Sequence, residues 1–140
     1  MSCLHDKDLL LWSEEQSALL RNGEYDLLDI ENIIEELDAV GKSDQHALYS
    51  YLVVLITHLL KKEYQPGMLS KSWIRSISNS RGGIAKILKR NPSYTRFLHD
   101  DIDDAYKMAR KNAILETGLK PEVFPKVNFY DIDFLLTEAD

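Results

Sequence analysis

The stretch at residues 47–66, "ALYSYLVVLITHLLKKEYQP", decides the fold of this 140-residue chain. Its large apolar residues recur three or four positions apart, which is typical of one face of an α-helix. These residues are Leu48, Leu52, Leu55, Ile56 and Leu59. Pro66 disfavours helix at the residue before it, and Ser43 or Asp44 can cap the other end. The pattern therefore predicts a helix from one of these caps to about Glu63.

The same period continues on both sides of this helix. It predicts helices at about residues 4–21, 26–40, 70–90 and 93–117, with a short last helix starting at Asp131 or Asp133. Gly41 and Gly118 stand where helices often end, so we expect breaks there. No segment has the alternation of a strand. The sequence thus predicts an all-α, single-domain bundle of four to five helices over residues 1–140, with a short C-terminal helix.

Two glycines, Gly82 and Gly83, interrupt the predicted helix at residues 70–90. Relative to alanine, two glycines in a helix interior cost about 2 kcal/mol. We expect either a kink at this point or the close approach of another helix.

Composition favours a cytoplasmic protein. The chain has one cysteine, Cys3, which excludes an internal disulfide framework and suits a reducing compartment. No histidine or other base flanks Cys3 in a catalytic pattern, so we interpret it as an incidental thiol. No apolar run approaches the roughly 18 residues of a membrane span, and the N-terminus lacks the basic and apolar regions of a signal peptide.

The net charge of −6 is unevenly distributed. Residues 1–60 carry −9, residues 61–90 carry +7 and residues 91–140 carry −4. A basic segment with Tyr64, Trp73 and Tyr94 in or near it is compatible with nucleic-acid binding. Neutralisation by the acidic helices of the same chain is the favoured interpretation.

No known motif implies a cofactor. The chain lacks the phosphate loop, the dinucleotide fingerprint, zinc-binding cysteine pairs and HExxH, as well as the Glu-x-x-His repeat of di-iron bundles. The acidic run "HDDIDD" at residues 99–104 is interpreted as a solvated face near a helix N-terminus. No partner is apparent in the sequence for His5, His46 or His99.

Polar residues beside the apolar stripes give one candidate cluster, composed of Glu35, Glu36, His58, Lys61 and Arg81. Arg81 shares the inner face of its helix with apolar residues and would need a carboxylate if it is buried. If the cluster is a site, Glu36 and His58 are the candidate metal ligands or proton-transfer groups, and Arg81 with Lys61 would hold phosphate. The alternative is a buried network that fixes helix register.

The order of motifs resembles that of the domain of unknown function 29 family (DUF29) of bacterial proteins. The motifs that carry the resemblance are Leu28-Asp29, Asn32, Glu35-Glu36, Gly41, His58-Leu59-Leu60-Lys61, Tyr64-Gln65-Pro66, Ser72-Trp73, Arg81 and Phe124-Pro125. The resemblance implies a compact all-helical bacterial protein and implies no activity. The chain departs from the family pattern at Gly82-Gly83.

Three functions remain open at this stage. The leading hypothesis is a non-enzymatic interaction or regulatory module that binds another protein or a second copy of itself, with no cofactor and no membrane. One alternative is a metal-assisted phosphodiester or nucleotide hydrolase that uses the Glu–His–Arg cluster. The other is nucleic-acid binding through residues 61–90.

Overall fold

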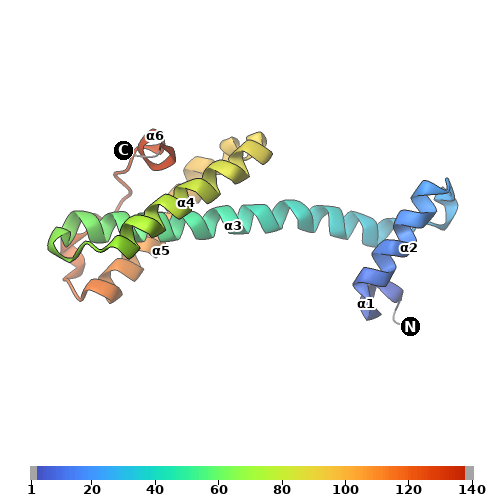
Figure 1. Ribbon diagram of the computed structural model, residues 1–140, viewed down its shortest axis with the longest axis horizontal. Helices are drawn as coiled ribbons and strands as arrows, with labels where there is room; N and C mark the ends of the chain where they lie inside the picture. Colours follow the sequence, from blue (N-terminus) through green and yellow to red (C-terminus); the bar gives the residue numbers. More distant parts are fainter. Residues whose placement is uncertain (1–2, 138–140) are drawn as a thin grey trace. The chain divides into compact units, whose positions relative to one another are not determined.

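A computed structural model of the chain describes residues 3–137 and contains no strand among them (Figure 1). The all-α expectation is confirmed. The α-helices are α1 (Leu4–Lys7), α2 (Leu9–Arg21), α3 (Ile30–Tyr64), α4 (Lys71–Arg90), α5 (Leu98–Thr117) and α6 (Ile132–Leu136). Short 3₁₀ turns lie at Tyr25–Leu27, Pro66–Met68, Pro92–Phe97 and Pro121–Val123. The chain forms two compact units, residues 1–42 and residues 43–140, which are described separately.

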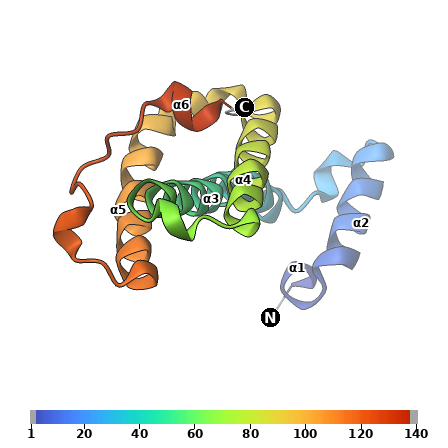
Figure 2. The same ribbon diagram turned by 60° about the vertical axis from the view of Figure 1, so that its left-hand side comes forward.

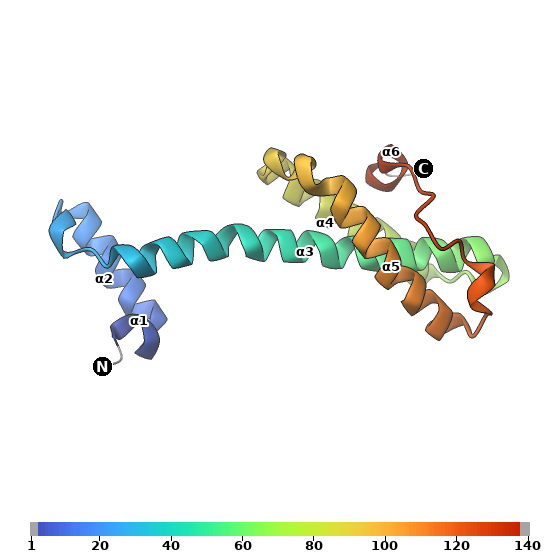
Figure 3. The same cartoon turned by 180° about the vertical axis from the view of Figure 1, so that it is seen from behind.

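The first unit begins with two helices where the sequence predicted one over residues 4–21. Asp8 has an extended backbone, with φ −154° and ψ 92°, and its side chain accepts a hydrogen bond from the backbone N–H of Leu11 at 3.0 Å. The prediction of a continuous helix is wrong because Asp8 caps α2 instead of extending α1. Figure 3 shows the two helices beside the first turns of α3.

The predicted helix end at Gly41 is also wrong, because α3 continues from Ile30 to Tyr64. A glycine that ends a helix usually takes a positive φ. In the described part of the chain only Gly23 and Gly118 do so, and Gly118 ends α5 with φ 71° as predicted. A glycine inside a helix costs only about 1 kcal/mol, and no proline follows Gly41 to enforce a break.

The second unit is built on the C-terminal part of α3. Figure 2 looks nearly along this helix and shows α4 and α5 on opposite sides of it. Ser70 caps α4, since its hydroxyl accepts from the N–H of Trp73 at 3.3 Å. The helix predicted at residues 93–117 begins as a 3₁₀ turn and becomes α-helical at Leu98.

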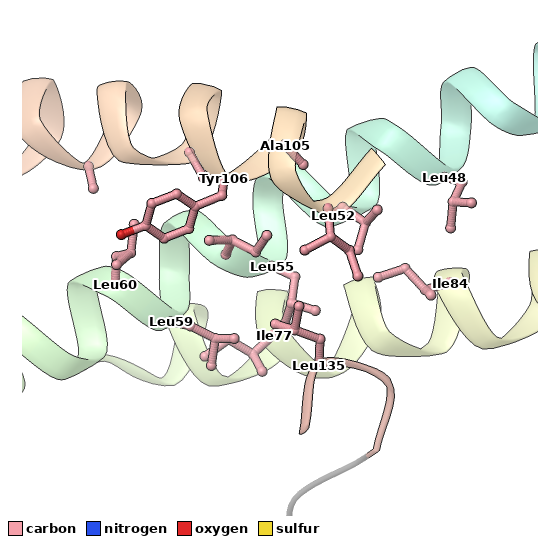
Figure 4. Packing of buried hydrophobic residues seen from close by; sticks show 14 of the residues in the cluster. Leu48, Leu52, Leu55, Leu59, Leu60, Ile77, Ile84, Ala105, Tyr106 and Leu135 are labelled. Atoms are coloured by element: carbon pink, nitrogen blue, oxygen red, sulfur yellow. The ribbon is translucent and has the colours of Figure 1, made fainter. Parts of the chain in front are cut away.

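The core of the second unit is apolar. Figure 4 shows side chains of α3, α4, α5 and α6 meeting in one cluster. The five residues of the predicted stripe, Leu48, Leu52, Leu55, Ile56 and Leu59, are all buried in it, together with Ile77 and Ile84 of α4 and Tyr106 of α5. The predicted inner face of the helix at residues 43–63 is therefore confirmed.

The two glycines of α4 differ in their surroundings. A Cβ on Gly83 would lie 2.6 Å from ring carbons of Tyr51 on α3, whereas a Cβ on Gly82 would meet nothing within 4 Å. Of the two expectations for this pair, close approach of another helix is confirmed at Gly83. Within the described residues, no helix is long and apolar enough to cross a lipid bilayer.

Candidate functional site

The five residues of the predicted cluster divide between the two units. Glu35 and Glu36 belong to the first unit, while His58, Lys61 and Arg81 belong to the second. Both glutamates lie on the same helix as His58, because the predicted break at Gly41 is not formed. A shared Glu–His–Arg site stays a prediction, and each part is described within its own unit.

In the second unit, His58 and Lys61 lie beside Trp73 of α4. The Lys61 Nζ is 4.5 Å from the centre of the Trp73 ring and 3.8 Å from Oε1 of Glu116 on α5. Lys61 is only 8% exposed. Its charge is therefore balanced by one carboxylate and one aromatic face, and its stem packs against the core.

The His58 ring lies 6.4 Å from the ring of Trp73, and its buried Nδ1 has no hydrogen-bond partner. Burial lowers the pKa of His58, and the charge of Lys61 lowers it further. Both effects favour the neutral form of the imidazole. A cation at Nδ1 would be repelled by Lys61, so this arrangement does not favour the predicted metal role of His58.

Arg81 is 4% exposed, which confirms that it faces the interior of the second unit. Its Nε donates to the carbonyl oxygen of Leu135 at 3.3 Å, and its Nη2 donates to that of Phe134 at 2.9 Å. The guanidinium also lies 5.2 Å from the centre of the Phe134 ring. These carbonyls are in the last turn of α6, where backbone oxygens lack helical partners and carry partial negative charge. Arg81 therefore attaches α6 to α4.

In the first unit, Glu36 pairs with a residue that sequence reasoning missed. Oε1 of Glu36 is 2.7 Å from Nε2 of His5, and Nδ1 of His5 is 3.4 Å from Oδ1 of Asp6. The sequence showed no partner for His5, and the structure gives it two, Glu36 and Asp6. The hydrogen bond to Glu36 raises the pKa of His5, burial opposes it, and Asp6 adds to the rise. The ring of Trp12 packs edge-on against the imidazole at 4.7 Å.

Asp29 is the centre of a second set of hydrogen bonds in this unit. Its Oδ2 accepts from Nδ2 of Asn32 at 2.8 Å and from Nε1 of Trp12 at 2.9 Å. Its backbone N–H donates to Oε1 of Gln16 at 2.8 Å. The bonds from Asn32 and then Trp12 lower the pKa of Asp29. Because Trp12 and Gln16 are both buried, this network fixes α2 against the start of α3.

The signal for this network was present in the sequence as spacing. Trp12 and Gln16 are four residues apart and share one face of α2, while Asp29 and Asn32 are three apart at the start of α3. The sequence alone does not connect these two pairs, because no local pattern shows that residues on two different helices share hydrogen bonds.

An apolar groove of about 200 Å³ lies between α2 and the first turns of α3, within the first unit. It is lined by Trp12, Ser13, Gln16, Ser17, Leu20, Ile33, Glu36, Leu37 and Val40. Leu37 is 66% exposed and Val40 is 60% exposed. The large apolar residues in this part of α3 are therefore largely open to solvent.

The acidic run at residues 99–104 was expected to be solvated. Asp100, Asp103 and Asp104 are exposed, but Asp101 is half-buried and its Oδ2 has no hydrogen-bond partner. Burial raises the pKa of Asp101, with smaller contributions from Asp104 and Asp100. The interpretation as a solvated face therefore holds for three of the four aspartates.

Comparison with known proteins gives one family. Residues 4–139 match the model of the domain of unknown function DUF29, so the chain belongs to this family. No curated protein and no solved structure matches the chain.

Proposed function

We propose that this DUF29 chain is a non-enzymatic protein-interaction module, and that its docking site is the apolar groove of the first unit. The observation that carries the proposal is the open apolar surface along this groove. Large exposed hydrophobic residues in the first unit are Leu9, Leu10, Leu11, Leu20, Tyr25, Leu27, Ile30, Ile34, Leu37 and Val40. Of these, Leu20, Leu37 and Val40 line the groove, and exposed apolar side chains gathered in one groove are typical of interaction sites.

The first unit has little apolar core of its own. Among its described residues, Trp12 is the one large hydrophobic side chain that is buried. Units of about 40 residues usually need additional stabilisation beyond their own core. An occupant that covers Leu20, Leu37 and Val40 would supply buried apolar area at the groove.

The shape of the groove suits a helix, because two helices with exposed leucines on their facing edges can receive a third in the helix-in-groove mode. Residues 1–42 hold 3 Lys/Arg and 11 Asp/Glu, a net charge of −8. The occupant that fits both properties is an amphipathic helix of another protein with Lys and Arg beside its apolar stripe. A second copy of the first unit would bring equal negative charge against it.

The proposal places the module in the bacterial cytoplasm. Its single cysteine suits a reducing compartment, and the family resemblance described above is to bacterial proteins.

The test uses the full chain and two synthetic helical peptides with identical apolar positions, one with Lys and Arg and one with Glu at the polar positions. Fluorescence anisotropy should detect binding of the basic peptide that weakens as salt rises. Leu37→Asp should reduce its affinity at least tenfold. Leu115→Asp is the matched control, since Leu115 is exposed on α5 in the second unit, and it should leave binding unchanged.

Equal binding of both peptides, or binding that Leu37→Asp does not weaken, would contradict the proposal. Sedimentation of the chain alone tests whether a second copy of the chain occupies the groove instead. A dimer that Leu37→Asp dissociates would show that it does.

A second candidate function is nucleic-acid binding through α4, because Lys71, Arg75, Lys86 and Lys89 are all exposed on it. Two other basic residues of the segment are paired within the second unit, Lys61 with Glu116 and Arg90 with Asp44 at 3.8 Å each. Binding of a labelled oligonucleotide at low salt, falling with added salt, would support this function. No binding at low salt would remove it.

A further inference from the structure

The N-terminal turn of the first unit brings three different metal-ligating groups together. One donor atom from each of Cys3, His5 and Asp6 lies within 4.8 Å of the other two. Cys3 is the N-cap residue of α1, and His5 and Asp6 are in its first turn. Tetrahedral zinc ligands lie about 3.3–3.8 Å apart when their bonds are about 2.0–2.3 Å long. Small side-chain rotations of exposed Cys3 and Asp6 would close the remaining gap.

We propose that Cys3, His5 and Asp6 form a binding site for a divalent transition-metal ion of the zinc class. A thiolate, an imidazole and a carboxylate together favour zinc over magnesium or calcium, which prefer oxygen ligands. Three protein ligands leave a fourth position for water or for a side chain of a bound partner. This proposal does not rest on the docking proposal above, although Glu36 and Trp12, which contact His5, also line the groove.

The imidazole is oriented for this role. Nε2 of His5 points to Oε1 of Glu36 at 2.7 Å, which leaves Nδ1 on the side of Asp6, 3.4 Å from its Oδ1. A metal-ligating histidine usually donates its other N–H to a carboxylate in this way, and the bond fixes both tautomer and ring orientation. The edge contact with Trp12 limits rotation of the ring further. Glu36 is thus a positioning residue.

A neighbouring polar side chain also contacts the thiol of Cys3. Nδ2 of Asn32 lies 3.6 Å from Sγ of Cys3 and donates to Asp29 at 2.8 Å. An amide has two N–H groups, so Asn32 can serve both acceptors. The network around Asp29 therefore reaches Cys3 through Asn32.

The competing explanation is a helix-terminus hydrogen-bond cluster without metal, in which a protonated His5 bridges Glu36 and Asp6. Titration of the reduced full chain with Co²⁺ separates the two, because cobalt replaces zinc and reports a bound thiolate by a sulfur-to-metal charge-transfer band. One equivalent of Co²⁺ should produce this band, and Zn²⁺ should abolish it.

Single-residue variants test which side chains bind the metal ion. Cys3→Ser should remove the charge-transfer band, and His5→Gln should weaken Co²⁺ binding at least tenfold. Glu36→Gln should weaken it about 10- to 100-fold, as expected for a supporting carboxylate. His99→Gln is the matched control, because His99 is exposed beside the aspartates of α5, and it should bind cobalt as the unmodified chain does.

Circular dichroism of each variant checks that the fold is retained. The absence of a charge-transfer band at stoichiometric Co²⁺ would overturn the proposal. So would a band that persists in Cys3→Ser, or binding that is lost in His99→Gln and retained in His5→Gln.

Discussion

In the second unit the buried side chains are mainly leucine, isoleucine and alanine, whereas in the described part of the first unit they are Trp12 and Gln16, both bonded to Asp29. The apolar residues of the first unit are largely exposed. Apolar packing stabilises wherever water is excluded, but a hydrogen-bond network gives a defined geometry with a smaller net stabilisation. We therefore infer that apolar packing stabilises the second unit, whereas hydrogen bonds fix the geometry of the first unit beside an exposed apolar surface.

The strongest test of this contrast is a pair of leucine truncations. Leu55→Ala removes a side chain that is 0% exposed in the core of the second unit, and it should lower the free energy of unfolding by about 2–5 kcal/mol. Leu37→Ala, in the groove of the first unit, should change it by less than about 0.5 kcal/mol. Urea denaturation followed by circular dichroism measures both. Similar losses for the two variants would show that the exposed stripe is buried in solution.

Arg81 tests whether polar contacts can matter as much as apolar ones within the second unit. Arg81→Ala removes two hydrogen bonds to the last turn of α6 and leaves a void in a buried position. We expect a loss of about 2–3 kcal/mol, and limited proteolysis should cut first near α6. Arg81→Lys cannot make both bonds in the same fork geometry and should recover less than half of the loss. A loss below about 0.5 kcal/mol would mean that α6 is held by Leu135 and its apolar neighbours alone.

The second unit was largely predictable because its signals are local. Ser70 before α4, Pro92 after it and Gly118 after α5 each act on the backbone of their own neighbours. The period of Leu48 to Leu59 needs no partner to be recognised. Burial of Arg81 followed from the same period, although its contacts with the carbonyls of α6 did not, since they join residues more than fifty positions apart.

The first unit was less predictable for two physical reasons. Asp8 and Gly41 each have weak local preferences that tertiary contacts can override. The structure has a break at Asp8, where a continuous helix was predicted, and a continuous helix through Gly41, where a break was predicted. The pairing of His5 with Glu36 links residues 31 positions apart, so no local pattern shows it. Only the close spacing of Cys3, His5 and Asp6 could have pointed to a site.

A substitution at Trp12 measures how much the hydrogen-bond network around Asp29 stabilises the first unit. Trp12→Phe keeps most of the buried ring and removes the N–H that Asp29 accepts at 2.9 Å. The free energy of local opening should fall by about 1–1.5 kcal/mol, which corresponds to amide exchange about tenfold faster in α2. Amides of α4 and α5 serve as the internal control and should exchange at unchanged rates. Unchanged exchange in α2 would mean that the apolar contacts of Trp12, and not its hydrogen bond, hold the first unit.

The smallest expected effect comes from the two glycines of α4, and it measures how tightly the second unit is packed. Gly82→Ala places a methyl group in open space and should raise the free energy of unfolding by about 0.5–1 kcal/mol, since alanine is the better helix former. Gly83→Ala gains the same propensity, but its Cβ would lie 2.6 Å from the Tyr51 ring. The ring must shift, so we expect the gain to vanish or to change sign.

Tyr51→Ala provides the background that isolates this contact. With the ring removed, Gly83→Ala should stabilise α4 about as much as Gly82→Ala does, and the double-mutant cycle gives the energy of the clash. If Gly83→Ala stabilises the unmodified chain as much as Gly82→Ala, the Tyr51 ring moves freely and the contact between α3 and α4 is looser than the rest of the core.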